Sequence, residues 1–276
     1  MSRPQVEPFF LSRDKHSLFC LLFSPPAGRP IVGAVLHVPA FAEEMNKSRR
    51  AVANAARAMA ERGRQVLLLD LHGTGDSSDD FGDATWPGWL DDVCAAVAWL
   101  RERSGASPAL WGLRSGCLLI NDLLDRVDCP NLLYWQPALS GDAMLMQFLR
   151  LRAMAGAVGG TDGPKETTRT LLGSLEGGTA LEIAGYMLSP LLALPYKEAR
   201  LGGPRYAGRR VTWLEMGLAA PPELTPASAQ RIERIRADGA RVTATAVAGH
   251  PFWMTQEIDE GAAFVSATAA LMAEAP

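Results

Sequence analysis

The chain has 276 residues, of which 48% are hydrophobic and 21% charged, proportions typical of a folded protein and inconsistent with long disordered regions. Its formal net charge of -3 at pH 7 leaves no basic stripe, which excludes nucleic acid as a predicted partner. Four cysteines stand singly, without the spacing of metal ligands, so no metal and no other cofactor is predicted.

The N-terminal segment contains no uninterrupted apolar stretch of the kind found in signal peptides. No segment approaches the roughly 20 apolar residues that a membrane-spanning helix needs. Cysteines that stand singly in the sequence are typical of proteins in reducing compartments, and we therefore expect a cytoplasmic protein. We predict one domain over residues 1–276. The sequence does not determine the oligomeric state, and a homodimer is one alternative.

Strand-length apolar runs alternate with helix-length amphipathic segments, which predicts a mostly parallel sheet covered on both faces. In chain order, the predicted elements are strands Val6–Leu11, Ser17–Phe23 and Ile31–Val38, helix Ser48–Arg62, strand Val66–Leu71, helix Trp89–Arg103, strand Ala109–Gly112, helix Gly116–Leu124, strand Asn131–Trp135, strand Val211–Met216, helix Ala227–Ala237, strand Val242–Val247 and helix Gly261–Met272.

The alternation stops between about residues 141 and 205. Met144–Met154 and Ala180–Leu194 have the apolar character of helices, and glycine-rich segments separate them. A helical insertion at this place is typical of a lid over an active site. The sequence therefore predicts a lid within a single domain.

The turn Gly112-Leu113-Arg114-Ser115-Gly116 is the most informative motif. It follows a predicted strand and begins a predicted helix, and it has the small residues that a nucleophile elbow needs two positions on either side of its apex. This motif predicts the α/β-hydrolase fold. The spacing places Arg114 at the apex, where a nucleophile is expected, and a guanidinium cannot accept an acyl group. Ser115 is then either a displaced nucleophile or a helix cap.

His250 follows the last predicted strand, the position of the triad histidine in this fold. The acid is harder to assign, because Ala220 stands where many relatives have aspartate after the preceding strand. Glu215 and Glu223 are the substitutes within reach, and either could equally be a solvated charge. We predict Ser115, His250 and Glu215 as the catalytic residues of a degenerate triad.

Two further loops belong to the predicted site. Asp70-Leu71-His72-Gly73-Thr74-Gly75-Asp76-Ser77 resembles the glycine-containing loop after the fourth strand of many α/β-hydrolases. In the loop after the third strand, Phe41 or Ala42 would supply one backbone N–H of an oxyanion hole. Glu44 follows them, in the phrase from Glu43 to Arg50. Its acidic pair and the basic pair Arg49-Arg50 could clasp this loop over the pocket, or the phrase is a solvated helix start capped by Asn46 or Ser48. We predict that Arg114, Phe41, Ala42 and Glu44 bind substrate.

Several longer phrases resemble the exosortase A system-associated hydrolase 2 family of Gram-negative bacteria. They are Val38 to Arg50, Trp135-Gln136-Pro137 with Ser140-Gly141, Gln147 to Arg152, Ala184 to Ser189, and Pro251 to Ile258. The resemblance covers the chain from about Val6 to Ile258. It implies an association with exopolysaccharide and protein-sorting genes, and it suggests that arginine is a usual residue in the elbow.

These observations support three functions. The first is a hydrolase of an ester, thioester or amide bond, with Ser115 as nucleophile. The second is a pseudo-hydrolase that binds an anionic small molecule through Arg114, because a guanidinium at a helix N-terminus suits carboxylates and phosphates. The third is an assembly partner in polysaccharide export, which would dock through the apolar segment Ile183–Leu194. The sequence favours the hydrolase.

Overall fold

The computed structural model describes residues 3–158, 166–217, 219–255, 257 and 259–274. Its centre is an eight-stranded sheet with the strand order β1-β2-β4-β3-β5-β6-β9-β10. The first three strands in this order pair antiparallel, and all the other pairs are parallel. The strands are β1 (Gln5–Arg13), β2 (His16–Ser24), β3 (Gly33–Val38), β4 (Arg64–Leu69), β5 (Ala109–Leu113), β6 (Asn131–Trp135), β9 (Arg210–Gly217) and β10 (Arg241–Ala248).

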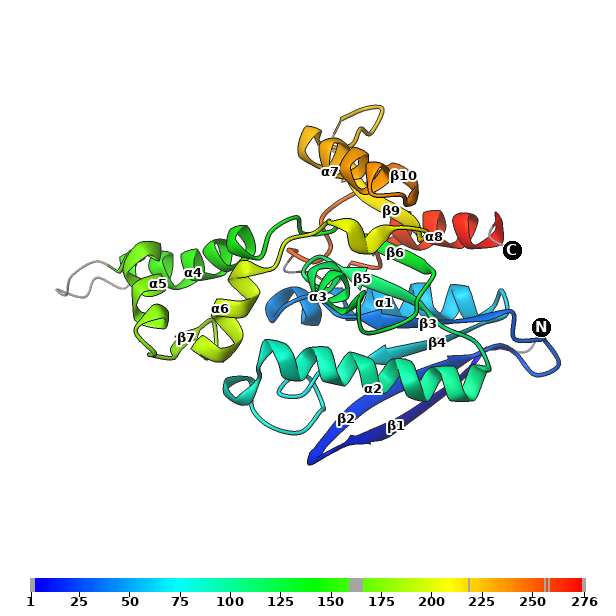
Figure 1. The fold of residues 1–276 in the computed structure, drawn as a ribbon, viewed down its shortest axis with the longest axis horizontal. Coiled ribbons are helices and arrows are strands. Elements are labelled where there is room, and N and C mark those ends of the chain that lie inside the picture. Colours follow the sequence, from blue (N-terminus) through cyan, green and yellow to red (C-terminus); the bar gives the residue numbers. More distant parts are fainter. Residues whose placement is uncertain (1–2, 159–165, 218, 256, 258, 275–276) are drawn as a thin grey trace.

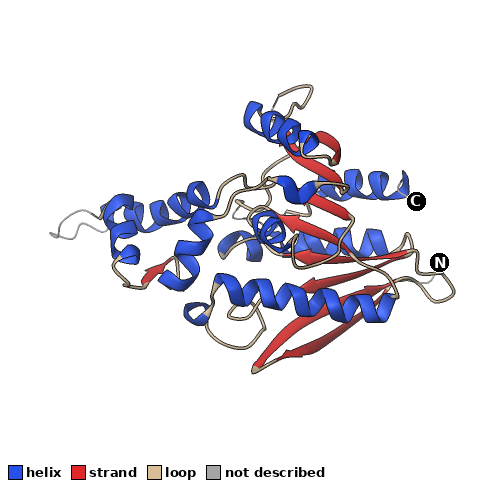
Figure 2. Ribbon diagram, in the orientation of Figure 1, coloured by secondary structure: helices blue, strands red, loops and turns tan. Residues whose placement is uncertain are grey.

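Helices cover both faces of this sheet, as Figures 1 and 2 show. One face carries α2 (Trp86–Ser104), α3 (Gly116–Leu123) and α7 (Pro226–Ala237), and the other carries α1 (Glu43–Ala60) and α8 (Ala262–Glu274). The central strands are therefore buried on both sides, and all five residues of β5 are buried. This explains why they appear in the sequence as continuous apolar runs.

Between β6 and β9 the chain leaves the sheet and forms a separate layer of short elements (Figure 1). This insertion contains α4 (Gly141–Val158), α5 (Thr168–Glu176), β7 (Leu181–Ile183), β8 (Tyr186–Leu188), α6 (Pro190–Glu198) and the 3-10 helix Pro204–Tyr206. It shares one hydrophobic core with the α2 and α3 face of the sheet. Part of the predicted glycine-rich stretch, residues 159–165, lies outside the described residues.

The prediction of one helix over Ala180–Leu194 is wrong. The structure has the hairpin of β7 and β8 there, followed by α6. Ala184 and Gly185 both have positive φ angles, of 50° and 85°, which a helix cannot contain and a tight turn requires. Ser189 then caps α6 by accepting a hydrogen bond from the Leu192 amide. The apolar composition of this segment does not distinguish a hairpin from a helix, because either structure would bury its leucine side chains.

The helix predicted over Ser48–Arg62 begins five residues earlier, at Glu43. Ser48 is therefore inside α1, where its hydroxyl donates to the carbonyl of Glu44 rather than capping the helix. Asn46 does not cap it either, because its side chain donates to the hydroxyl of Tyr186. The earlier start carries Glu43 and Glu44 into the first turn of α1 and brings them to the carboxyl edge of the sheet. Among the described residues, no helix is long and apolar enough to cross a membrane.

Candidate functional site

The turn from β5 to α3 has the geometry of a nucleophile elbow with Arg114 at its apex. Arg114 has a φ of 55°, a left-handed conformation that costs energy for a residue with a side chain. The two flanking glycines are required by close packing. A Cβ on Gly116 would lie 2.3 Å from the carbonyl oxygen of Val38, and a Cβ on Gly112 would lie 2.9 Å from the amide of Cys117. The backbone geometry therefore agrees with the apex position that the glycine spacing predicted for Arg114.

The Arg114 side chain forms a largely buried ion pair with Glu44. Arg114 Nε lies 3.1 and 3.2 Å from the two carboxylate oxygens, and Nη2 lies 3.1 Å from Oε1. The two side chains are only 13% and 15% exposed. The guanidinium also lies over the ring of Trp253, 5.6 Å from its centroid, and Nη2 is 3.4 Å from the sulfur of Met144. The charge at the apex is thus compensated within the protein.

Burial raises the pKa of Glu44, and the adjacent Arg114 opposes that rise. The carboxylate needs the guanidinium, because a buried carboxylate without a partner carries a large desolvation cost. The basic residues that follow in α1 have other partners: Arg49 pairs with Asp70, and Arg50 pairs with Glu260. Glu44 therefore contacts the elbow and does not clasp the loop through its own helix.

Ser115 lies immediately behind the apex and is 4% exposed. Its hydroxyl makes no cap hydrogen bond to α3 and has no hydrogen-bond partner among the described residues. Tyr196 is its neighbour, and burial raises the pKa of the Tyr196 phenol. The Tyr196 hydroxyl likewise has no hydrogen-bond partner within the described chain.

Ser115 lines a small cavity of about 10 Å³, together with Phe41 and Trp89. That volume holds at most a single water molecule. Phe41 also lines the larger pocket in front of the elbow, where it stacks on Tyr196 with ring centroids 4.8 Å apart. Because its oxygen is buried and the adjoining space is so small, the hydroxyl of Ser115 is not accessible to a substrate in this conformation.

The other two predicted triad residues are not hydrogen-bonded to Ser115 in the described structure. Glu215 is 1% exposed, and its oxygens accept hydrogen bonds from the Thr225 amide and the Trp213 indole. His250 is exposed on the loop after β10. In the part of the chain that the structure describes, no hydrogen bond connects the side chains of Ser115, Glu215 and His250. Glu223, the other predicted acid, is exposed.

A pocket of about 200 Å³ opens in front of the elbow, between the loop after β3 and the insertion. Its walls are mainly aromatic and aliphatic side chains, with charged groups near the floor and the mouth. The lining residues are Phe41, Glu43, Glu44, Lys47, Met144, Gln147, Phe148, Leu151, Tyr196, Trp253 and Met254. Leu151 and Met254 are 45% and 53% exposed, which places them at the rim.

Of the predicted binding residues, Phe41 and Glu44 line this pocket, and Arg114 pairs with Glu44 but is not itself a lining residue. Ala42 is buried beside them with a φ of 49°, the strained backbone that this loop needs before α1. Sequence reasoning missed Tyr196, Met144 and Trp253. Trp253 lies within a phrase that the sequence singled out. Tyr196 and Met144 lie in the insertion, where no local signal shows which side chains face the elbow.

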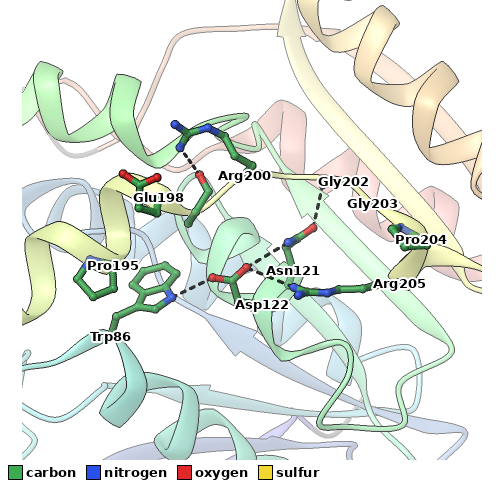
Figure 3. A pocket seen from close by; sticks show the side chains of 11 residues that line it. Trp86, Asn121, Asp122, Pro195, Glu198, Arg200, Gly202, Gly203, Pro204 and Arg205 are labelled. Carbon is green, nitrogen blue, oxygen red and sulfur yellow. Dashed lines mark hydrogen bonds and ion pairs between the residues drawn. The ribbon is translucent and has the colours of Figure 1, made fainter.

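A larger hollow of about 520 Å³ lies elsewhere, between the far end of α3 and the end of the insertion. Figure 3 shows that its inner polar groups bond to one another. The Asp122 carboxylate accepts from the Trp86 indole and the Asn121 amide, and it pairs with Arg205. These residues brace the insertion against α2 and α3. Because their hydrogen bonds are already satisfied, the pocket at the elbow is the better candidate site.

Within the described ranges, no group of three or more His, Cys, Asp and Glu side chains is arranged to hold a metal ion. The candidate site therefore consists of the elbow, the Arg114–Glu44 ion pair and the pocket above it.

No family model and no curated protein matches this sequence. Among solved structures, the chain is similar to the esterase Est1E of Butyrivibrio proteoclasticus with bound ferulic acid, at 16% identity and a TM-score of 0.67, over 96% of this chain and 98% of that one. It is also similar to an esterase of Rhizomucor miehei at 12% identity, a TM-score of 0.61 and coverage of 99% and 84%. A proline iminopeptidase of Mycobacterium smegmatis matches at 13% identity, a TM-score of 0.59 and coverage of 97% and 98%. The predicted α/β-hydrolase fold is confirmed.

Proposed function

We propose that this protein is a pseudo-hydrolase that binds a small amphipathic molecule in the pocket above the elbow. The observation that carries the proposal is the Arg114–Glu44 ion pair, which occupies the place of a nucleophile. Acyl transfer needs a nucleophile, a base within hydrogen-bond reach and a group that orients the base. In the described structure the elbow apex supplies none of these.

The pocket supports binding through its walls. Phe41, Phe148 and Trp253 offer apolar area, and the insertion closes over them. A concave, mostly apolar pocket with few polar groups at its floor is typical of small-molecule sites. In this proposal the insertion acts as the predicted lid.

A hydrolase that uses Ser115 is the second candidate. It is favoured by the unpartnered hydroxyl of Ser115 at the start of α3, a place where a helix N-terminus stabilises negative charge. This function requires that the buried hydroxyl of Ser115 become accessible and that a base, such as His250, form a hydrogen bond with it; the described structure shows neither. The binding function requires neither change, and we therefore prefer it.

The sequence resemblance to the exosortase A system-associated hydrolase 2 family suggests that the protein acts in exopolysaccharide and protein-sorting systems. In that setting the bound molecule would be a small component of those systems. The cytoplasmic location, the homodimer and a docking role of Ile183–Leu194 in polysaccharide export remain predictions.

The test combines a binding measurement with an activity measurement. 1-Hexanol is titrated against the protein by saturation-transfer NMR, and 4-nitrophenyl hexanoate is offered as a substrate. Gln147→Trp places an indole in the pocket, and Leu191→Trp is the matched control, because Leu191 is 68% exposed and does not line the pocket. We expect Gln147→Trp to abolish hexanol binding, the control to retain it, and the ester to hydrolyse at the buffer rate. Ester hydrolysis that is lost in Ser115→Ala would establish the hydrolase instead.

A further inference from the structure

The charged side chains around the pocket cancel in pairs. Glu44 pairs with Arg114 at the floor, and Glu43 lies 3.8 Å from Lys47 nearer the mouth. Glu43 is 44% exposed and Lys47 is 29% exposed, so water also screens the outer pair. A ligand that enters the pocket therefore meets no uncompensated charge among these four groups.

The Arg114–Glu44 ion pair can still form further hydrogen bonds. A guanidinium has five N–H donors, and a carboxylate accepts at about four lone-pair sites. Arg114 uses Nε and Nη2 toward Glu44 and Met144, and the described residues offer no partner to Nη1. The Glu44 carboxylate accepts three hydrogen bonds from Arg114. Glu44 lines the pocket, so its carboxylate can accept a further hydrogen bond from a ligand, with Arg114 beside it as its ionic partner.

A primary amide or a hydroxyl carries a donor and an acceptor in the same small group. Such a head group can donate to Glu44, which lines the pocket, without breaking the ion pair. A carboxylate or phosphate has no proton to donate, and it would lie beside the Glu44 carboxylate. That contact of like charges is unfavourable, and displacing Glu44 would leave a buried carboxylate unpaired.

We propose that the pocket selects a neutral head group that carries a hydrogen-bond donor, such as a primary amide or a hydroxyl, on a short apolar chain. Glu44 is the specificity-determining residue, because it occupies the place at Arg114 that an anionic ligand would need. This inference rests on the proposed binding function. It replaces the anionic ligand that the sequence led us to expect. The volume of about 200 Å³ limits the ligand to a small molecule.

The experiment compares hexanamide with hexanoate at pH 7.5 by isothermal titration calorimetry. The two probes have the same size and chain, and they differ in head-group charge. We expect the wild-type protein to bind hexanamide about tenfold more tightly or better, since like charges in contact cost several kcal/mol and each factor of ten in affinity needs only about 1.4 kcal/mol. This comparison needs no variant.

Glu44→Gln removes the competing carboxylate and keeps its size. In this variant hexanoate gains at least about tenfold and becomes the better ligand, because Arg114 then has no anionic partner. Glu61→Gln is the control: it makes the same chemical change on an exposed residue at the other end of α1, outside the pocket, and leaves the wild-type preference in place. Circular dichroism checks that each variant is folded.

The outcomes distinguish the selectivity inference from the proposed binding function. If wild-type protein prefers hexanoate, or if Glu44→Gln shifts the preference no more than Glu61→Gln does, the selectivity inference is wrong and the binding function stands. If neither probe binds to the wild-type protein or to Glu44→Gln, the proposed binding function fails together with the inference.

Discussion

At Arg114, backbone and side chain have separate roles. The backbone takes the strained conformation of an elbow apex, with a φ of 55°, and the side chain turns to Glu44 and Trp253. The sequence predicted the apex, because glycine spacing depends on the local backbone alone. It could not predict the partner of the guanidinium, since Glu44 lies 70 positions away in the chain. For the same reason the predicted acid Glu215 could not be recognised as a group already bonded to Trp213 and Thr225.

Glu44 makes the stability of the protein depend on pH. Burial raises its pKa in the folded state above the ordinary value of 4.5, so the folded protein holds this proton more tightly than the unfolded chain does. Protonation of Glu44 therefore stabilises the folded state, and this stabilisation is fully present below pH 4.5. It is lost as the pH rises through the pKa of Glu44 in the folded state. We expect the free energy of unfolding of the wild-type protein, relative to Glu44→Gln, to fall as the pH increases from 4.5.

Urea unfolding at a series of pH values measures this difference. Glu43→Gln serves as the control, because it removes a carboxylate from the same turn of α1 without removing the buried one. A difference that grows with pH, or one that follows Glu43→Gln, contradicts the assignment of the effect to Glu44.

The elbow is also the element whose geometry tolerates substitution least. A methyl group on Gly116 would lie 2.3 Å from the Val38 oxygen and 2.6 Å from the Pro39 oxygen, and both are backbone atoms that cannot turn aside. We expect Gly116→Ala to lower the free energy of unfolding by about 3 kcal/mol, as overpacking of a buried site does.

Gly173 in α5 provides the comparison, because a Cβ there would meet no atom within 4 Å. Gly173→Ala should stabilise the protein by about 0.5–1 kcal/mol, since alanine favours a helix more than glycine does. Thermal unfolding of both variants checks the pair. Equal effects at the two positions would show that the close packing of Gly116 on the β3 loop is not a real constraint.

Among the elements, the strands and helices of the sheet layers were predicted well, and the insertion was predicted poorly. Each central strand is buried on both faces, so its apolar run is continuous and easily recognised. The segment Ala180–Leu194 has the same apolar composition, but its turn at Ala184 and Gly185 is the feature that decides between hairpin and helix. Helix α5 was missed because only two of its nine residues, Leu171 and Leu175, are buried.

For the molecule as a whole, the order of the sheet brings distant segments to one edge. The elbow, the β3 loop with Glu44 and the loop that carries Trp253 are far apart in sequence, and they meet at the floor of one pocket. Parallel strands produce this convergence, since their carboxyl ends lie at a common edge. The fold could therefore be predicted from patterns along the chain, whereas the chemistry of the site depends on which side chains those loops bring into contact.

The central claim is that the elbow holds an ion pair in place of a nucleophile. Intact-protein mass spectrometry after incubation with a fluorophosphonate tests it most directly, because this reagent forms a stable adduct only with an activated nucleophile. The account predicts that the mass of the wild-type protein is unchanged, as is that of Ser115→Ala. A stoichiometric adduct on the wild-type protein that is absent from Ser115→Ala would contradict it.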